Sequence, residues 1–490
     1  MATSNGRPDV SNQTTSDLSR SFSVGGYISV GLGSIVGIGW VIYAAQWVLS
    51  GGPLGTAIAF AICTAFFLPI GACYAELSAA MPRAGGAMVF AYCAFGPMVS
   101  FLTGWAMALL YVSIAPFETI AIGALTEVLL PEKYIVPLYH IAGFEISSVS
   151  LISGVCAGIG LTIINMGGTR LSVNFQAAAV LLMLACVIVF TVTALVYGDV
   201  RNLLPLFSSN GALLAVAPAS IIGVLASTPF FMAGWDTIPQ AAEEAGIDMK
   251  PKRLATAIFL SIVLGGLFYI IIGIALGMSA ERDTIANLIE NKSDLPTAEI
   301  FQSAMGLTWA KILVLFTALL GLLTTLNAFM VAAPRLLFSL GRSGFLPEWF
   351  AHTHETRRTP VNSTLFVGLF AVLGPFLGSA ALAVIVNSGS LCVALTYLIA
   401  TAAALRLRTS DPDMNRPYQA PRGMITIGVI FAIVFISLMT VPGSPGQLRP
   451  IEYGIVLTWF LVGIVMYRII ESSSATDSEY QRRMVLGETG

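Results

Sequence analysis

Charged residues are scarce in this chain. Asp, Glu, Lys and Arg together make up 10% of its 490 residues, whereas soluble domains carry about 25%. Hydrophobic residues supply 56% of the chain and lie in long blocks, and the net charge of −2 indicates no basic surface for nucleic acid. These features exclude a soluble enzyme, a disulfide-rich secreted domain and a nucleic-acid-binding protein.

Histidine and paired cysteine are nearly absent as well. The three histidines fall in loops, so we expect His352 and His354 to be solvated rather than to bind a metal. The six cysteines form no C-x-x-C pair and are expected to act as small hydrophobic residues. Without an intramembrane histidine or a nucleotide-binding loop, neither a membrane-embedded enzyme nor direct ATP drive is favoured, and no cofactor or metal is expected.

What the chain has in abundance is apolar stretches of about 17–28 residues, each long enough to cross a bilayer as a helix. We count twelve, which predicts an all-α polytopic membrane protein. The predicted spans are 24–48, 54–80, 98–126, 147–166, 173–197, 217–240, 254–278, 309–340, 361–377, 380–404, 424–442 and 451–470.

The loop charges predict the orientation. With the N-terminus inside, 18 Lys and Arg residues fall on the inner side and 6 on the outer side, as the positive-inside rule requires. Both ends, residues 1–20 and 472–490, are therefore expected to be cytoplasmic tails of a protein in the cytoplasmic or plasma membrane. The first twenty residues lack an apolar signal-peptide core. The longest loop, 279–308, is expected to carry a short surface helix.

The first span is unusually rich in glycine at its middle. Gly37 and Gly39 flank Ile38, and each glycine costs a helix about 1 kcal/mol relative to alanine. A local unwinding at 37–39 is therefore predicted. Unwound backbone at that depth is tolerated only where it lines a cavity.

The sixth span repeats this design, because Pro229 removes a backbone donor and Gly234 adds a flexible point. Two interrupted helices at corresponding places in two halves point to the midplane binding site of a transporter.

A helix restarting after Gly37 presents free N–H groups that suit a carboxylate. Unwound carbonyls suit an ammonium group. A site that offers both free N–H groups and free carbonyls would therefore suit an α-amino acid, which carries a carboxylate and an ammonium group. The carbonyls that we expect to contribute belong to Ser34, Ile35, Phe230 and Ala233.

Several motifs resemble those of the amino acid–polyamine–organocation (APC) superfamily. The most specific is YAELSAAMPRAGG at 74–86, which is followed by Phe95 and Gly96. The resemblance extends over roughly residues 20–410. Its other segments are the glycine-rich first span, 234–237 (GWDT), 242–244 (AEE), 251–253 (PKR), 334–335 (PR), 342–347 (RSGFLP) and 358–360 (RTP).

The resemblance implies a five-plus-five inverted repeat with alternating access around the first and sixth spans. The repeats would cover 21–200 and 214–408, followed by two further helices over 420–471. It also implies substrate carboxylate on the 37–39 amides, substrate amine on carbonyls of the sixth span, and closure over the substrate by Phe230 or Phe231. Trp40 and Ile38 are bulkier than is usual in the first-span motif, and the fifth span lacks the lysine that links some members to protons, with Met183 near its place.

Two acids lie well inside predicted spans, where ionisable residues are functional candidates. Asp236 follows the sixth-span break and is expected to bind substrate or to cap the restarting helix. Glu118, in the third span, is expected to meet a substrate amine or a proton, or to pair with a hydroxyl. Because no Lys or Arg lies in the central layer, the cavity should favour substrates that bear a positive group.

Four further residues are candidates for gating or coupling. Glu76, near the inner end of the second span, is expected to stabilise a gate with Arg335 as its partner. Thr324 and Thr325 in the eighth span offer hydroxyls to a sodium ion beside the first break, or bond back to their own helix.

The sequence thus predicts a secondary transporter for zwitterionic or cationic amino acids, working by H⁺ or Na⁺ symport or by exchange. Two alternatives stay open. One is a permease for polyamines or ethanolamine, which would gain nothing from the 37–39 amides. The other is a membrane nutrient sensor.

Overall fold

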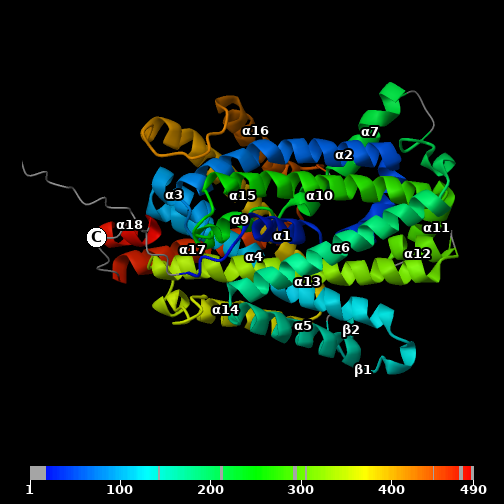
Figure 1. Cartoon of the computed structure of the whole chain (residues 1–490), viewed down its shortest axis with the longest axis horizontal. Coiled ribbons are helices and arrows are strands. Elements are labelled where there is room, and N and C mark those ends of the chain that lie inside the picture. The colour runs from blue at the N-terminus through cyan, green and yellow to red at the C-terminus, as the bar shows by residue number, and fades with distance from the viewer. Residues whose placement is uncertain are drawn as a thin grey trace, which may run out of the picture.

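The computed structural model describes residues 18–141, 144–209, 213–290, 295–303, 306–444, 446–473 and 478–486. The first seventeen residues of the predicted tail lie outside them. The described chain is nearly all α-helix, and most of the long helices run along the longest axis of the molecule (Figure 1). The exception is a two-stranded antiparallel hairpin of β1 (Pro137–Ile141) and β2 (Phe144–Ser147).

The long apolar segments match the predicted spans. They are α1 (Val24–Ile35), α2 (Gly39–Ala80), α4 (Pro97–Leu129), α5 (Ser148–Met166), α6 (Thr169–Tyr197), α7 (Leu213–Leu225) with α8 (Thr228–Met232) and α9 (Thr237–Gln240), α10 (Lys252–Ser279), α13 (Thr308–Arg342), α14 (Val361–Leu373), α15 (Ser379–Ser410), α16 (Arg422–Thr440) and α17 (Pro450–Ser473).

Among the described residues, nine helices are long and apolar enough to cross a membrane, and the segment from α7 to α9, bent by 50°, makes a tenth. The helix α2 spans 42 residues, but a kink at Gly52, where φ is 70°, divides it at the predicted boundary between the first two spans. With α2 counted as two spans the described chain has eleven, and the shorter helix α14 gives the predicted twelfth, while α1 forms the first part of the first span. This is the architecture of a multi-pass membrane protein.

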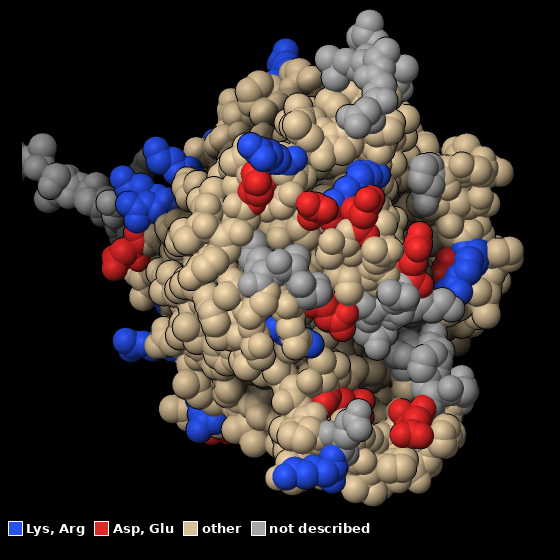
Figure 2. All heavy atoms as spheres, turned by 90° about the vertical axis from the view of Figure 1, so that its right-hand side faces the viewer, with Lys and Arg blue, Asp and Glu red and all other residues tan. Residues whose placement is uncertain are grey.

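The two ends of the bundle carry short elements that the sequence did not predict in full. One end, which we call the α18 end, holds α3 (Ala87–Phe95) and α18 (Ser478–Leu486), which pack on each other. The opposite end, the hairpin end, holds β1, β2, α11 (Arg282–Glu290) and α12 (Pro296–Ser303), so the long predicted loop contains two helices rather than one. Charged side chains of both signs are scattered over this end (Figure 2).

The helix α1 lies in the middle of the bundle beside α9 (Figure 1), and it packs against α6, α10 and α13. Two of its glycines allow this close packing. A Cβ on Gly33 would lie 2.0 Å from the side-chain nitrogen of Gln176, and one on Gly31 would lie 2.6 Å from the Ser261 hydroxyl. These glycines therefore admit neighbouring helices, whereas Gly37 and Gly39 lie at the break itself.

Candidate substrate site

The first break separates α1 from α2. Val36, Gly37 and Ile38 lie between the two helices, and the N–H of Val36 still donates to the carbonyl of Leu32 at 3.0 Å. No side chain caps the start of α2. Within the described residues, no group accepts a hydrogen bond from the N–H groups of Gly37, Ile38 or Gly39. These free donors at a helix N-terminus lie where the sequence analysis expects a substrate carboxylate.

The carbonyl end of α1 is held by neighbouring helices. The Thr325 hydroxyl donates to the carbonyl of Gly33 at 3.0 Å, and the Tyr269 hydroxyl donates to that of Ile35 at 3.0 Å. The Thr324 hydroxyl donates to Gly321 of its own helix at 2.9 Å. Both threonine hydroxyls are therefore engaged with backbone, and the carbonyl of Ile35 already has one donor.

The second break lies between α8 and α9, and it directly contacts the first. The carbonyl of Gly234 accepts hydrogen bonds from the hydroxyls of Ser34 and Thr237, each at 2.7 Å. Gly234 has a φ of 118°, and a Cβ there would lie 2.7 Å from the Ser34 carbonyl oxygen. Only glycine fits this position. In the described chain, the carbonyls of Phe230 and Ala233 accept no hydrogen bond, so they remain available to a cationic group.

Asp236 is held by donors from three elements. Its side chain is buried, and its carboxylate accepts hydrogen bonds from the hydroxyls of Tyr111 and Tyr397, the latter at 3.1 Å. It also accepts the N–H of Gly234 at 3.1 Å. Its expected contact with substrate stays a prediction. The carboxylate does not cap α9; it turns back across the break and ties it to α4 and α15.

The aromatic residues of the site divide into two groups. The Phe231 ring lies beside the first break, because a Cβ on Gly39 would lie 2.4 Å from it. It also packs against Tyr43 and Trp47, with ring centroids 5.3 and 4.8 Å away. Phe230 is 43% exposed, so Phe231 is the better candidate to close over a substrate.

The bulk of Trp40 does not fill the site. Its ring packs edge-on against Phe190 of α6 and Phe268 of α10. Ile38 remains half-exposed at the break. Of the two bulky residues of this motif, Ile38 rather than Trp40 is therefore the one that lies open at the break.

Glu118 is the second intramembrane acid that the sequence analysis identified. It is buried in α4, and its Oε2 atom makes no hydrogen bond in the described structure. Glu118 follows Tyr111 by seven residues, which places the two on one face of the helix. Tyr111 contacts the second break through Asp236. Glu118 therefore lies about two turns from the site along the helix face that borders it.

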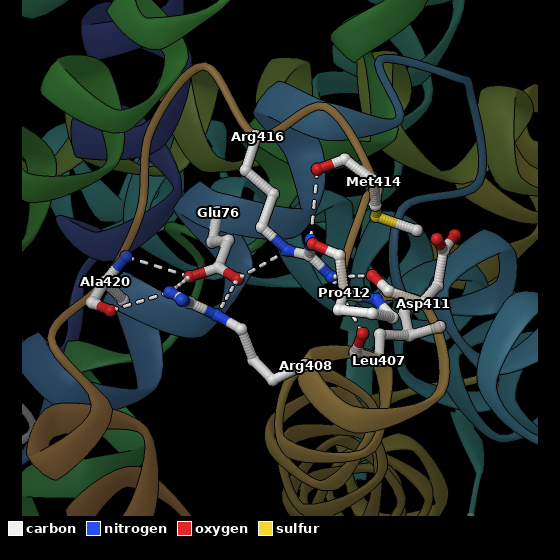
Figure 3. Close-up of polar contacts among 8 residues, drawn as sticks. All are labelled: Glu76, Leu407, Arg408, Asp411, Pro412, Met414, Arg416 and Ala420. Carbon is white, nitrogen blue, oxygen red and sulfur yellow. Dashed lines mark hydrogen bonds and ion pairs between the residues drawn. The ribbon is translucent and has the colours of Figure 1, made fainter.

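Glu76 does not pair with Arg335. Its buried carboxylate lies between the guanidinium groups of Arg408 and Arg416 (Figure 3). Arg408 donates two hydrogen bonds of 2.7 Å, and the backbone N–H of Ala420 donates one of 2.8 Å. Glu76 thus fastens the segment between α15 and α16 to the end of α2. The predicted partnership fails because Arg408 of α15 and Arg416 of the segment after it pair with the carboxylate, while Arg335 is paired with Glu244.

Arg335 instead pairs with Glu244, which lies in the short helix η3 (Ala242–Glu244) after α9. Thr169 of α6 also donates to Glu244, at 2.6 Å. The neighbouring Tyr27 hydroxyl of α1 donates to Ala241 at 2.7 Å. Arg335 therefore links the segment after α9 to α13 and α6, and its expected role at a gate stays a prediction.

Glu243 makes a second set of contacts at the same place. Arg342 donates two hydrogen bonds to it, at 2.9 and 3.0 Å, and Arg83 lies 3.5 Å away. Burial alone would raise the pKa of Glu243, but the charges of Arg342 and Arg83 and the hydrogen bonds from Arg342 and Ala84 lower it to about 2. A lowered pKa means that this stabilisation is complete at neutral pH and is lost only as the pH falls from about 4.5 to about 2.

Several site residues escaped the sequence analysis. Glu243 and Glu244 stood in a recognised motif without a role, and nothing local identified their arginine partners. The tyrosines that hold Asp236 and Ile35 looked like ordinary apolar-span aromatics. The only available signal was chemical, since a buried carboxylate requires donors. The missed residues are Arg83, Tyr111, Glu243, Glu244, Tyr269, Arg342, Tyr397, Arg408 and Arg416.

Comparison with known proteins finds one matching family model and several relatives, of which three are described here. The model of the family described as "Amino acid permease" matches residues 22–466. The branched-chain amino acid permease BcaP of Bacillus subtilis is 24% identical, covering 89% of this chain and 90% of the relative. The methylthioribose transporter of the same organism is 24% identical over 93% of this chain and 95% of the relative. The cationic amino acid transporter 7 of Arabidopsis thaliana is 28% identical over 89% and 72%.

The Glu76 cluster predicts a large loss of stability in the Glu76→Gln variant. Removing one partner of a buried ion pair costs about 3–5 kcal/mol, so thermal unfolding of the purified protein in detergent should begin well below the wild-type temperature. Glu471→Gln is the control, because its pair with Arg468 is exposed and should contribute about 1 kcal/mol or less. Equal shifts for both variants would contradict the structural role of Glu76.

The Asp236 contacts predict that Asp236→Asn destabilises the protein without removing the substrate contacts. Two tyrosine hydroxyls would lose a charged acceptor, at a cost of about 1–3 kcal/mol. Unfolding temperature should fall, whereas its rise on adding substrate should persist. The outcome against this assignment is a variant of normal stability that no longer responds to substrate.

Proposed function

This chain belongs to the amino acid permease family, and we propose that it is a secondary active transporter that works by alternating access. It is an amino acid transporter, as are relatives named for branched-chain and for cationic substrates. An amine permease is not favoured, because such a substrate lacks the carboxylate that the free donors of the first break would bind. A nutrient sensor has no support from the relatives either.

The observation that carries the proposal is the pairing of the two breaks. The free N–H groups of Gly37, Ile38 and Gly39 would bind the carboxylate of an α-amino acid. The open carbonyls of Phe230 and Ala233 would accept its ammonium group. The Ser34 hydroxyl holds the breaks together, so one small zwitterion would satisfy both sets of backbone groups at once.

The side chain of the substrate would meet Ile38, Phe231 and the face of α4 that carries Glu118. An apolar wall suits the branched-chain substrate named for one relative. A buried carboxylate without a partner suits the cationic substrates named for another. We therefore propose that the site accepts neutral amino acids and that Glu118 extends this range to Lys, Arg or ornithine.

Alternating access would use the arginine clusters as a gate. The bias of 18 against 6 positive residues supports a cytoplasmic position for the α18 end, in the cell or plasma membrane. Glu243 and Glu244 bind α13 there, so this conformation would be closed toward the cytoplasm. Release of substrate to the inside would require both acids to leave Arg342 and Arg335. Coupling to protons or exchange of substrates would then drive the cycle.

The free donors predict that Gly39→Ala abolishes uptake while the protein stays folded in the membrane. The added methyl group would lie 2.4 Å from the Phe231 ring and displace the ring or the helix start, and a displacement of this size costs about 100-fold in a positioned reaction or binding step. Uptake of labelled amino acid into proteoliposomes measures the effect. Gly160→Ala is the control, since nothing lies within 4 Å of that site. Near-normal uptake by Gly39→Ala would remove the site from this position.

The position of Glu118 predicts a change of selectivity in Glu118→Gln. Loss of the charge should reduce uptake of Lys and Arg by about tenfold, because a close charge pair in a site contributes more than 1 kcal/mol. Uptake of Leu should change much less. A competition panel against one labelled neutral substrate measures both. Parallel losses for neutral and cationic substrates would instead assign Glu118 to folding or proton transfer.

A further inference from the structure

A cluster of neutral amides joins α1 to the surrounding helices near the first break. Gln176 of α6 is completely buried. Its Oε1 accepts a hydrogen bond from Asn327 of α13 at 2.8 Å, and Asn327 in turn accepts one from Asn165 of α5 at 2.8 Å. Ser172 donates to both asparagines, at 2.9 and 3.2 Å. Three helices of the bundle are thus connected by side chains that carry no charge.

Gln176 extends this cluster to the broken helix. Its Nε2 donates to the carbonyl of Ser29 in α1 at 3.2 Å and to that of Thr324 in α13 at 3.0 Å. With Oε1 bound to Asn327, the amide has used both of its N–H groups and its oxygen. Gly33 leaves the space that the amide occupies, since a Cβ there would lie 2.0 Å from Nε2.

Among the described residues, no Asp, Glu, Lys, Arg or His side chain hydrogen-bonds to this amide. The helices α1 and α5 hold no Asp, Glu, Lys, Arg or His. The charged residues of the other three helices packed here lie near their ends, and the titratable Tyr27 and Tyr269 hydroxyls donate to backbone elsewhere. Those end residues are Arg170 of α6, Lys252 and Arg253 of α10, and Lys311, Arg335 and Arg342 of α13.

The same junction is where the sequence pointed to a sodium ion held by Thr324 and Thr325. Both hydroxyls donate to backbone carbonyls, which leaves their lone pairs free, so these bonds alone do not keep a cation out. The N–H groups of Gln176 bind the carbonyls of Ser29 and Thr324 and lie in the same space. An amide that directs its N–H groups into this space supplies the positive partial charge that a cation would bring.

We propose that Gln176 is a positioning residue that holds α1 against α6 and α13 by neutral hydrogen bonds, so that no sodium ion or proton binds at this junction. The inference rests on the proposed transport function. Neutral hydrogen bonds are weaker than charge-assisted ones. The α1 helix can therefore leave this contact in each cycle without releasing an ion, and any proton coupling has to use a different group.

The proposal is tested by giving the junction a charge. In Gln176→Glu, a carboxylate would face the carbonyls of Ser29 and Thr324, which is unfavourable unless a cation or a proton joins it. Uptake by this variant should rise at least about fivefold when sodium replaces choline, or when the pH is lowered, because a buried carboxylate without a counter-charge is costly. Wild-type uptake should not respond to sodium.

Two further variants separate positioning from folding. Gln176→Lys should acquire a pH dependence of the same sign as that of Gln176→Glu, since its ammonium form restores the bonds to both carbonyls, but it should gain no dependence on sodium. Gln176→Met keeps the volume without the bonds, and it should raise the KM several-fold while leaving the wild-type pH profile unchanged. Gln46→Glu, at an exposed position of α2, is the matched control and should gain no dependence on sodium.

The outcomes are distinct from those for transport itself. Wild-type proteoliposomes that take up no amino acid would contradict the proposed function. With active wild-type protein, a fall in uptake or in substrate-induced thermal stabilisation when sodium is removed would overturn the inference. It is equally overturned if Gln176→Glu and Gln176→Lys both retain the wild-type responses to sodium and pH. If both charged variants are inactive, an unchanged KM in Gln176→Met would overturn it.

Discussion

The structure depends on the satisfaction of backbone polar groups where two helices are interrupted inside the bundle. An unpaired backbone group in an apolar interior costs several kcal/mol, so a break survives only if other groups replace the lost helical bonds. Here the Ser34 hydroxyl bridges to Gly234, Tyr269 and Thr325 hold the end of α1, and Asp236 gathers the second break. Among the groups left over in the described residues are the free donors at 37–39 and the open carbonyls of Phe230 and Ala233, and these are groups that a substrate would bind.

The α18 end and the middle of the bundle differ in how their charged groups are bound. Carboxylates bound by arginine gather at the α18 end, where Glu76, Glu243 and Glu244 are each buried. In the middle, the contacts of the broken helices are neutral except for Asp236, whose charge is held by tyrosine hydroxyls and backbone. This separation allows the strong ion pairs to form where water can replace an arginine during opening, while the centre exchanges only hydrogen bonds of moderate strength.

Much of the fold could be predicted because it follows from local sequence. The twelve spans follow from apolar length, and the first break follows from two glycines around Ile38. The partners of the buried acids could not be predicted. Glu76 and Arg408 are separated by 332 residues. Many arginines lie at the ends of spans, and the sequence does not show which of them pairs with Glu76. The donors to Asp236 could not be predicted for the same reason, since Tyr397 lies 161 residues away. The short helix α3 and the hairpin were missed because apolar and polar residues do not alternate regularly in either segment.

Glu118 and Gln176 show how a transporter can assign the tasks of an ion-binding site to different side chains. Both are buried next to the moving parts, but one is a carboxylate without a partner and the other is an amide with every hydrogen-bonding atom in use. A group without a partner can respond to an arriving cation, because its state changes when the cation binds. A fully bonded neutral group cannot respond in this way and instead fixes the geometry. The response of this bundle to charged substrate or to protons is therefore expected to start at α4, whereas the junction of α1, α6 and α13 keeps the broken helix in register until the arginine clusters open.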